Sequence, residues 1–517
     1  MMTAAAAHYK RFYDEQLHRL HLQRQDNVEG QKQSALLSGV IVAKVAPRRW
    51  QITCPSQAAA FKPWRLGSQV KLSAQSECCR DELFPRYGAF TVVEVEADAL
   101  TVEHSSASWG CLGAEDRWFL HNWTETGDVD ELSAAVVRFS EEAPQVFQEL
   151  IAGTPSYDRR QHMYLNIDVN GDLLQRVAAR HKLNQGQISA VADLIVRVIG
   201  LLHGPPGTGK TTTLCCLLEY LLVEGETIDL AAASHSAIDV VLRGLLEKVV
   251  PNVPCNIARL GHVSRSSDLR IKRLNVDGQV RETGLANPCK PSFRQCREEL
   301  MTNCSVLAGT PVALSRAAHK KAAVIDEAAQ LTMPATMCPI NANTERLVLA
   351  GDPRQLPPTT GPRASFRGLG SSMLESFCDR HFPINTLCEQ YRMVEDIMKP
   401  PNAIIYKGIL VCADSVKKEV VGEPAGFPWP GTSAVFIHVD GREEQASCNF
   451  SKFNTQEAIA SCRIGKALLA AGVSAADIGV ITPYAAQAEL IKCHLGNNQL
   501  YVGTSVNATL TKLAPSQ

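Results

Sequence analysis

The chain has 517 residues, 45% of them hydrophobic, and a formal net charge of −1. This length exceeds what one hydrophobic core supports, so we expect about three domains, and the hydrophobic content excludes an intrinsically disordered protein. The near-zero charge excludes a general attraction to nucleic acid, so any nucleic-acid site must be a local groove.

The cysteines and the start of the chain indicate a cell compartment. There are 17 cysteines without a Cys-x-x-Cys pair, which favours reduced thiols over a disulfide framework or a zinc site. The opening MMTAAAAHYKRFYDEQ becomes charged too early for a secretory signal, and no run of about 18 apolar residues predicts a membrane span. We therefore expect an intracellular protein, cytoplasmic or nuclear or both, which is monomeric and has no membrane partner.

The pattern of apolar and polar residues changes twice within the first third of the chain. Residues 1–35 contain a charged amphipathic helix, expected from His8 to Asn27. Residues 36–104 alternate apolar and polar side chains between turn signals, which predicts a small antiparallel β-barrel or sheet. Residues 105–182 are mixed and predict a connecting segment with a helix from about Glu131 to Ile151.

From residue 183 onward, buried strands alternate with helices, which is typical of a parallel α/β sheet. The apolar run Leu194–Leu202 predicts a strand, and Thr211–Leu222 predicts the helix that follows it. The stretches AAVIDEAAQ and ERLVLAGDPRQ predict further strands that end in polar residues. We expect a first α/β domain at 183–377 and a second at 378–517.

A glycine-rich loop lies between the first strand of this region and its helix. It fits the spacing Gly-x-x-x-x-Gly-Lys-Thr, whose backbone N–H groups cradle phosphates while the lysine and threonine reach the β/γ-phosphates and Mg²⁺. The alternative is an ordinary turn between a strand and a helix. The predicted nucleotide-binding residues here are Gly204, Pro205, Pro206, Gly207, Thr208, Gly209, Lys210, Thr211 and Thr212.

Four later residues supply the chemistry that a bound nucleotide would need. Asp326, at the end of a strand, can hold Mg²⁺ together with Thr211, and Glu327 can activate the attacking water. Gln355, in AGDPRQLPP, can reach the γ-phosphate or its water. Arg392, in EQYRM, can stabilise developing phosphoryl charge, although a surface salt bridge is the alternative.

A basic stretch interrupts the α/β alternation at residues 251–303. Two interpretations remain open: a solvated insertion, or a surface that faces a nucleic-acid backbone. The cations in and beside this insertion are Arg259, Arg265, Arg270, Lys272, Arg273, Arg281, Lys290, Arg294 and Arg297.

These motifs, in this order, resemble superfamily 1 helicases. The segments LNQGQ, ASHSAID, RLGH, GDPRQLPPTT and AGVSAADIGVITPY narrow the resemblance to the branch of the nonsense-mediated-decay and immunoglobulin-mu-binding-protein helicases. The resemblance implies two RecA-like domains preceded by the β-barrel, with Gln187 reading adenine. It also implies nucleic-acid contacts from Ser234, His235, Ser236, Thr310, Pro483 and Tyr484.

The expected function is therefore an ATP- and Mg²⁺-dependent helicase that moves 5′ to 3′ on single-stranded RNA or DNA. Two departures from the family pattern matter: Ala233-Ser234-His235 stands where Pro-Ser-Asn is usual, and the match ends at Ser505–Ala508, where motif V begins. The second RecA-like domain is thus expected to be incomplete, so that this chain binds ATP but hydrolyses it slowly and unwinds nothing. The alternatives are a non-catalytic module that binds ATP and nucleic acid, and an unrelated P-loop enzyme such as a nucleotide kinase or an AAA-type ATPase.

Overall fold

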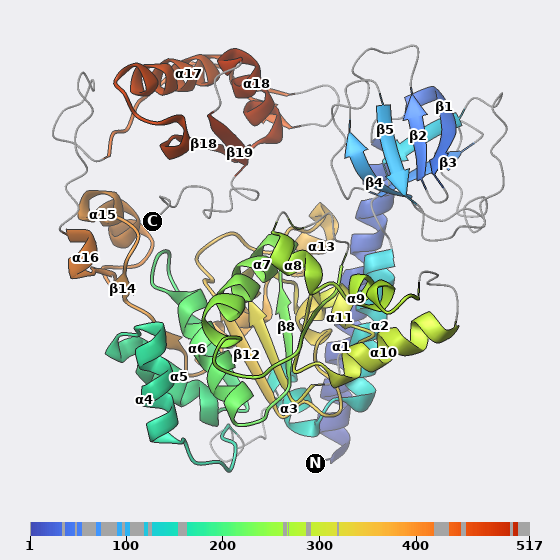
Figure 1. Ribbon diagram of the computed structural model, residues 1–517, viewed down its shortest axis with the longest axis vertical. Coiled ribbons are helices and arrows are strands. Elements are labelled where there is room, and N and C mark those ends of the chain that lie inside the picture. Colours follow the sequence, from blue (N-terminus) through green and yellow to red (C-terminus); the bar gives the residue numbers. More distant parts are fainter. Residues whose placement is uncertain are drawn as a thin grey trace. The chain divides into compact units, whose positions relative to one another are not determined.

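The chain folds into two compact units, Met1–Cys388 and Glu389–Gln517, each of which is described by itself. The structure is a computed structural model (Figure 1). It describes residues 2–33, 37–46, 49–53, 69–73, 90–95, 99–103, 118–122, 127–153, 163–261, 266, 268–285, 291–317, 320–417, 434–445, 451–496 and 500–504.

The first unit opens with a long helix and six short strands. These elements are α1 (Met2–Gln33), β1 (Leu37–Ala46), β2 (Arg49–Thr53), β3 (Gln69–Ser73), β4 (Phe90–Val95), β5 (Ala99–Glu103) and β6 (Trp118–Asn122). The strands pair antiparallel in the order β1-β2-β5-β4-β3-β6, which forms a closed barrel. The expected end of this region at residue 104 was wrong, because β6 pairs with both β1 and β3. The intervening residues 104–117 carry no alternation, so the sequence pattern gave no sign of a further strand.

Four helices follow before the main sheet begins: α2 (Gly127–Glu142), α3 (Gln145–Ala152), α4 (Gly171–His181) and α5 (Gln185–Val196). Helices α2 and α3 fall where the sequence predicted a helix. The predicted strand Leu194–Leu202 was wrong in its first part, because α5 continues to Val196 and the strand starts at Ile199. A continuous apolar run fits either a buried strand or a buried helix, and here a capping box at Asn184 starts a helix that runs into it.

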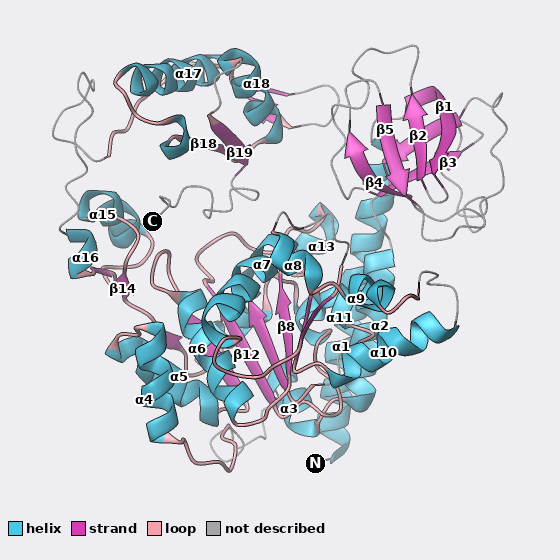
Figure 2. Ribbon diagram, viewed as in Figure 1, coloured by secondary structure: helices cyan, strands magenta, loops and turns pink. Residues whose placement is uncertain are grey.

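A seven-stranded parallel sheet forms the centre of the first unit, as Figure 2 shows. Its strand order is β13-β7-β12-β11-β8-β10-β9. In chain order the elements are β7 (Ile199–His203), α6 (Lys210–Val223), β8 (Ile228–Ala232), α7 (His235–Gly244), η1 (Leu245–Val249), β9 (Ile257–Arg259), α8 (Leu269–Arg273), α9 (Val276–Glu282), α10 (Pro291–Asn303), β10 (Val306–Gly309), α11 (Pro311–Leu314), β11 (Ala322–Asp326), η3 (Ala328–Gln330), α12 (Met333–Met337), β12 (Arg346–Gly351), α13 (Pro362–Phe366), α14 (Met373–Asp379) and β13 (Asn385–Thr386). Because β13 pairs with β7, the first α/β domain extends past residue 377, where the sequence pattern placed its end.

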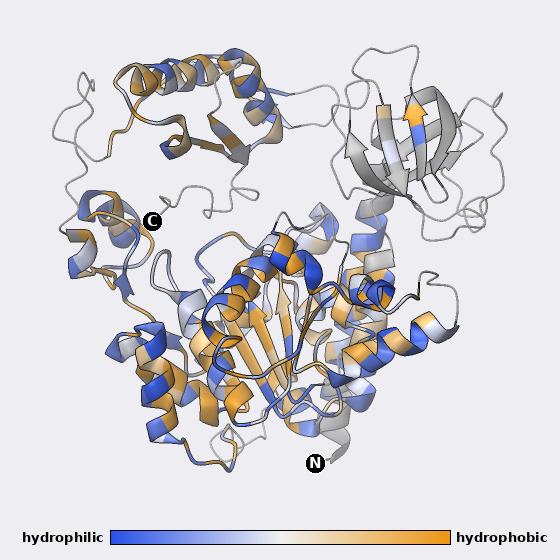
Figure 3. Ribbon diagram, in the orientation of Figure 1, coloured by the Kyte–Doolittle hydropathy of each residue, from blue (hydrophilic) through white to orange (hydrophobic). Residues whose placement is uncertain are grey.

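Helices cover both faces of this sheet, so its strands are apolar on both sides (Figure 3). Alternate residues of one strand enter two different cores: Leu347 and Leu349 of β12 pack on the side of α1, α2 and α3, while Val348 and Ala350 pack on the side of α4, α5 and α6. Burial on both faces explains the continuous apolar runs in the sequence. The parallel α/β sheet expected from the sequence is confirmed for this unit.

The second unit contains smaller elements: β14 (Glu389–Gln390), α15 (Glu395–Ile404), β15 (Val411–Cys412), α16 (Asp414–Lys417), β16 (Glu444–Gln445), β17 (Lys452–Phe453), α17 (Thr455–Ala470), η4 (Ala475–Asp477), β18 (Gly479–Thr482), α18 (Ala485–Leu495) and β19 (Tyr501–Thr504). Its described strands form three two-stranded sheets, of which β14-β15 and β18-β19 are parallel. The segment Ser505–Ala508, matched above to motif V, lies outside the described residues. Among the helices described in both units, none combines the length and the hydropathy that a bilayer-spanning helix requires.

Candidate nucleotide-binding site

Three neighbouring strands of the sheet end beside one another and carry most of the predicted site. Strand β12 lies between β7 and β11, and all three run parallel. The glycine-rich loop follows β7, Asp326 ends β11, and Gln355 lies in the turn after β12. Parallel strands place their carboxyl ends on one edge of the sheet, which is where open α/β sheets bind ligands.

The glycine-rich loop, residues 204–209, has a shape that only glycine permits at several positions. Gly207 and Gly209 both have φ of +77°. A Cβ on Gly204 would lie 2.7 Å from Cβ of Lys210, so the backbone passes directly over the start of α6. The Thr208 hydroxyl donates to the carbonyl of Pro205 at 2.8 Å and closes the loop. The loop is therefore held in its curve by its own bonds.

Helix α6 begins at Lys210 without a side-chain cap on its first N–H groups. Uncapped N–H groups at a helix N-terminus attract anions, since they point along the positive end of the helix dipole. Thr211 and Thr212 follow in the first turn and are half-buried. The predicted phosphate-binding residues are thus gathered in one loop and one helical turn.

Lys210 lies between two carboxylates. Its ammonium contacts Oδ1 of Asp326 at 3.0 Å and Oε1 of Glu327 at 2.5 Å. Burial opposes the charge on Lys210, but the two carboxylates outweigh it, so the pKa of Lys210 is raised and its ammonium stays protonated at neutral pH. A phosphate that reaches this lysine must therefore compete with both carboxylates.

Glu327 occupies an unusual backbone conformation directly after β11. Its φ of +52° lies in the left-handed region, which costs a non-glycine residue on the order of 1–2 kcal/mol. Its N–H donates to Oδ1 of Asp326 at 2.9 Å, and its Oε2 accepts from Nε2 of Gln330 at 3.2 Å. Gln330, which the sequence analysis missed, therefore orients the carboxylate that was predicted to activate water.

The oxygen donors near Lys210 fit a magnesium ion that is shared with phosphates. Thr211 offers a hydroxyl from α6, and Asp326 offers a carboxylate at the end of β11. No group of three or more metal-ligating side chains occurs among the residues that the structure describes. Mg²⁺ is usually bound by one or two protein ligands, with phosphates and water filling its other positions, and these two oxygen donors would match that number.

Gln187, predicted to read adenine, is buried and already holds the phosphate loop. Its Oε1 accepts from the N–H of Asn184 at 3.0 Å, and its Nε2 donates to the carbonyl of Thr208 at 3.0 Å. A carboxamide has a second N–H and a second lone pair, so one donor and one acceptor remain for an adenine edge. The Asn184-x-x-Gln187 capping box could have been found in the sequence, but the bond to Thr208 could not.

Gln355 is linked to the start of the phosphate loop through residues that the sequence analysis missed. Its Nε2 donates to Oδ2 of Asp352 at 2.7 Å. The other oxygen of Asp352 accepts from Nε2 of His203 at 3.1 Å, and His203 immediately precedes Gly204. Both Asp352 and His203 are buried.

Arg392 lies in the second unit, in the turn that follows β14, where its side chain is exposed. Its backbone N–H donates to Oε1 of Gln390 at 2.9 Å, so the turn itself is well anchored. Pro483 and Tyr484 also belong to this unit, between β18 and α18, and both are exposed. The predicted roles of these three residues stay predictions.

The other predicted nucleic-acid contacts lie on the same edge of the main sheet as the phosphate loop. Ser234, His235 and Ser236 follow β8 at the start of α7, and Thr310 follows β10 as the N-cap of α11. Strands β8 and β10 are neighbours, so the structure brings these residues to one edge. Ser234 and Ser236 are exposed.

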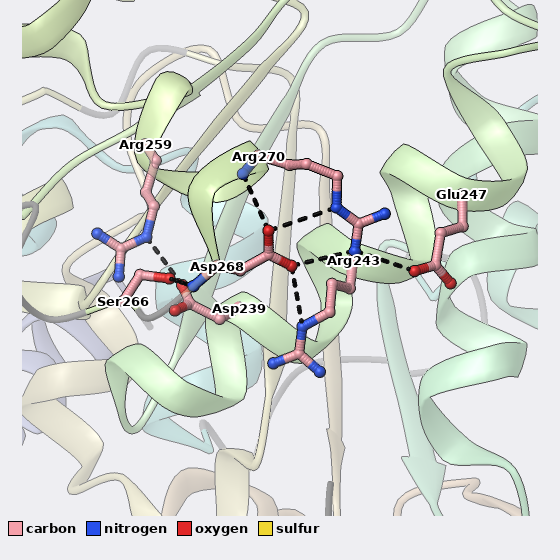
Figure 4. A network of polar contacts seen from close by, with 7 residues as sticks. All are labelled: Asp239, Arg243, Glu247, Arg259, Ser266, Asp268 and Arg270. Carbon is pink, nitrogen blue, oxygen red and sulfur yellow. Dashed lines mark hydrogen bonds and ion pairs between the residues drawn. The ribbon is translucent and has the colours of Figure 1, made fainter. Parts of the chain in front are cut away.

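Carboxylates neutralise part of the basic insertion, as Figure 4 shows. Arg259 is 1% exposed, and its Nε donates to Oδ1 of Asp239 at 2.9 Å. Arg270 contacts both Asp268 and Glu247 through its guanidinium. In this part of the insertion carboxylates pair with the arginines, in a buried pair at Arg259 and in partly exposed pairs at Arg270.

The remaining cations of the insertion differ from one another in pairing and in exposure. Arg297 pairs with Asp277 at 2.9 Å, whereas Arg273, Arg281 and Arg294 are exposed. Lys272 is half-buried. Arg265, Lys290 and His262 of the RLGH segment lie outside the described residues. Both interpretations of the insertion remain predictions for the exposed arginines.

Comparisons with known proteins agree with the geometry. Two family models described as AAA domains match the chain, one at residues 182–301 and 289–361 and the other at 369–508. The regulator of nonsense transcripts 1 homolog of Neurospora crassa is 30% identical over 345 residues, which is 60% of this chain and 31% of the relative. The ATP-dependent helicase NAM7 of Saccharomyces cerevisiae is 29% identical and covers 71% of this chain and 40% of its own length.

Two further similarities were found. DNA-binding protein SMUBP-2 of Mesocricetus auratus is 27% identical over 61% of this chain and 37% of its own length. The crystal structure of the arterivirus nonstructural protein 10 helicase aligns with 72% of this chain and 56% of its own at 14% identity, with a TM-score of 0.31. The chain thus spans about a third of the length of the curated relatives it matches.

Proposed function

Because this chain belongs to the superfamily 1 helicases, in the branch of the regulators of nonsense transcripts, we propose that it binds and hydrolyses ATP to move along single-stranded RNA or DNA. We also propose that the movement runs 5′ to 3′ and that the barrel of β1–β6 is the β-barrel which precedes the first RecA-like domain in this branch. The protein is proposed to act as a monomer inside the cell, in the cytoplasm, the nucleus or both.

One observation supports nucleotide binding above all others: the Lys210 ammonium at the start of α6, held between Asp326 and Glu327. A largely buried lysine, with its side chain 12% exposed, beside a glycine-rich loop and an uncapped helix N-terminus forms a site for a polyphosphate. When phosphates enter, the ammonium can exchange its carboxylate partners for phosphate oxygens at little cost in solvation, because it is already desolvated.

The residues around Lys210 support a mechanism for hydrolysis. The loop and the first turn of α6 bind the phosphates, while Thr211 and Asp326 would hold Mg²⁺, which neutralises the phosphate charge. Glu327 accepts a proton from the attacking water, and Gln330 keeps its carboxylate oriented. Gln355 reaches the γ-phosphate or its water from the turn after β12.

Strand contact is proposed for the same edge of the sheet. Ser234, His235 and Ser236 present a helix N-terminus and exposed hydroxyls, and Thr310 begins the next helix along this edge. Such groups suit phosphate oxygens of a nucleic-acid backbone, which give affinity without reading sequence. Arg392 is proposed to stabilise the developing phosphoryl charge.

Steady-state ATP hydrolysis with and without single-stranded RNA or DNA tests the proposal. We expect turnover to depend on the strand. A parallel unwinding assay tests the direction, since movement from 5′ to 3′ would open a duplex with a 5′ single-stranded tail and leave one with a 3′ tail closed. Nucleotide binding without strand-dependent turnover would support the second candidate, a non-catalytic module that binds ATP and nucleic acid. The same assay tests the prediction that this chain turns over slowly. Turnover that requires a second phosphate acceptor instead of a strand would favour a nucleotide kinase.

A further inference from the structure

The short helix α13 begins seven residues after Gln355, and side chains of α1 bind its start. Oε1 of Gln23 accepts from the N–H of Gly361 at 2.7 Å. Oδ2 of Asp26 accepts from the N–H groups of Arg363 and Ala364, at 3.0 and 3.1 Å. Residue 362 is a proline without an N–H, so α1 supplies partners to three consecutive available donors at this end of α13.

The N-cap residue of α13 cannot provide this cap itself. The N-cap position of α13 is Gly361, which has no side chain to accept a hydrogen bond. Asp26 fills the role from 337 residues earlier in the sequence, with its side chain only 7% exposed. A Cβ on Gly361 would lie 2.3 Å from Cβ of Asp26, so the glycine is what allows the approach.

The other end of α13 also faces α1. The guanidinium of Arg19 points to the carbonyl of Gly368 at 3.5 Å. A carboxylate at the N-terminus and a cation beyond the C-terminus both match the helix dipole. Three side chains of one face of α1 therefore fix the position of α13, in the part of the first unit where the two helices lie in contact (Figure 1).

Between Gln355 and Gly361 the chain has little freedom. Two of the five intervening residues are Pro357 and Pro358, whose rings fix φ and favour an extended course. At its near end the segment is held by the bond from Gln355 to Asp352. Releasing its far end would return backbone freedom to these residues, and Gln355 would spend less time at the phosphate edge.

We propose that Asp26 is a positioning residue for Gln355: it anchors the far end of the loop that carries Gln355, and so sets the preference of the site for a γ-phosphate. This inference rests on the proposed nucleotide site. Asp26 lies on α1, outside the parallel sheet, and would control that site from there. Helix α1 precedes β1 in the chain. The helix that binds the end of the loop carrying Gln355 is therefore also the helix that connects to the first barrel strand.

The test compares the affinities of ADP and of the non-hydrolysable ATP analogue adenylyl imidodiphosphate, so that it needs no turnover. Asp26→Ala is expected to lower the preference for the triphosphate about three- to tenfold while ADP affinity changes less than about twofold. Asp26→Asn keeps an acceptor oxygen and should retain most of the preference. Gln25→Ala is the matched control, since Gln25 is the neighbouring exposed residue and bonds to His21 of the same helix.

A double-mutant cycle distinguishes positioning from simple destabilisation. If Asp26 acts through Gln355, then Asp26→Ala adds nothing to the loss caused by Gln355→Ala, and hydrogen exchange quickens at Leu356–Ala364. Additive losses, or equal effects of Asp26→Ala and Gln25→Ala, would overturn this inference but leave the proposed nucleotide site intact. If Gln355→Ala leaves the preference for the triphosphate over ADP unchanged, or the wild-type chain binds neither nucleotide, the proposed nucleotide site is refuted together with this inference.

Discussion

Replacing Glu327 with glutamine should separate ATP binding from ATP hydrolysis. Lys210 donates to Glu327 at 2.5 Å and must leave this partner, at least in part, to reach a phosphate. Glutamine keeps an oxygen that accepts from the ammonium but removes the charge of the carboxylate, so the lysine should leave it more easily by about 0.2–1 kcal/mol, the contribution of a partly exposed ion pair. We expect ATP to bind up to about fivefold more tightly to the variant.

Hydrolysis should change in the opposite direction. A glutamine cannot accept the proton of the attacking water, and general bases typically contribute about 100- to 10,000-fold to a rate. Fluorescence titration with a non-hydrolysable analogue measures the binding, and phosphate release measures turnover. Glu345→Gln is the matched control, because Glu345 is exposed, pairs with Lys321 and precedes β12 at the opposite edge of the sheet. Weaker binding, or turnover within tenfold of wild type, would refute the role assigned to Glu327.

Three further outcomes follow from the same structure. Gln187→Ala should weaken ATP more than CTP, because only ATP loses the predicted adenine contact, while loss of the bond to the carbonyl of Thr208 affects both nucleotides. Equal losses for the two nucleotides in a binding titration would mean that the base is read elsewhere. Removing Mg²⁺ with EDTA should abolish hydrolysis by the wild type. Asp326→Asn should lower turnover by more than about 100-fold, while ADP binding without magnesium persists. Retained turnover in either experiment would contradict the metal assignment. Arg259→Ala should reduce the free energy of unfolding, measured by urea denaturation, by about 3–5 kcal/mol. Arg270→Ala, at an exposed position, should reduce it by less than about 1 kcal/mol. Similar losses for the two variants would contradict the burial of the Arg259 ion pair.

The sequence predicted the placement of those parts of the candidate site that are local in the chain. The phosphate loop, Lys210 and Thr211 are adjacent residues, and their roles depend on a strand, a turn and a helix that each have a short-range signal. Asp326 and Glu327 could be placed because they end a strand of the same parallel sheet, whose carboxyl edge gathers the functional residues.

Contacts between distant residues left no such signal. Asp26 meets Arg363 across 337 residues, and the Asp352 link to His203 joins two strands that are not consecutive in the chain. A residue type alone does not reveal such a partner, since an aspartate on a charged helix usually faces solvent. Similarly, the arginine count of the insertion did not show that Arg259 is buried against Asp239.

Equilibrium titration of ATP into wild-type chain and Lys210→Ala tests the central claim most directly. Lys321→Ala serves as the control, since Lys321 is an exposed lysine at the opposite end of the β11 strand. The loss of a charge-assisted contact of about 1.5–3 kcal/mol predicts that Lys210→Ala binds ATP about ten- to a hundredfold more weakly, with Lys321→Ala unchanged. An ATP affinity that Lys210→Ala leaves unaltered would contradict the assignment of this loop as the nucleotide site.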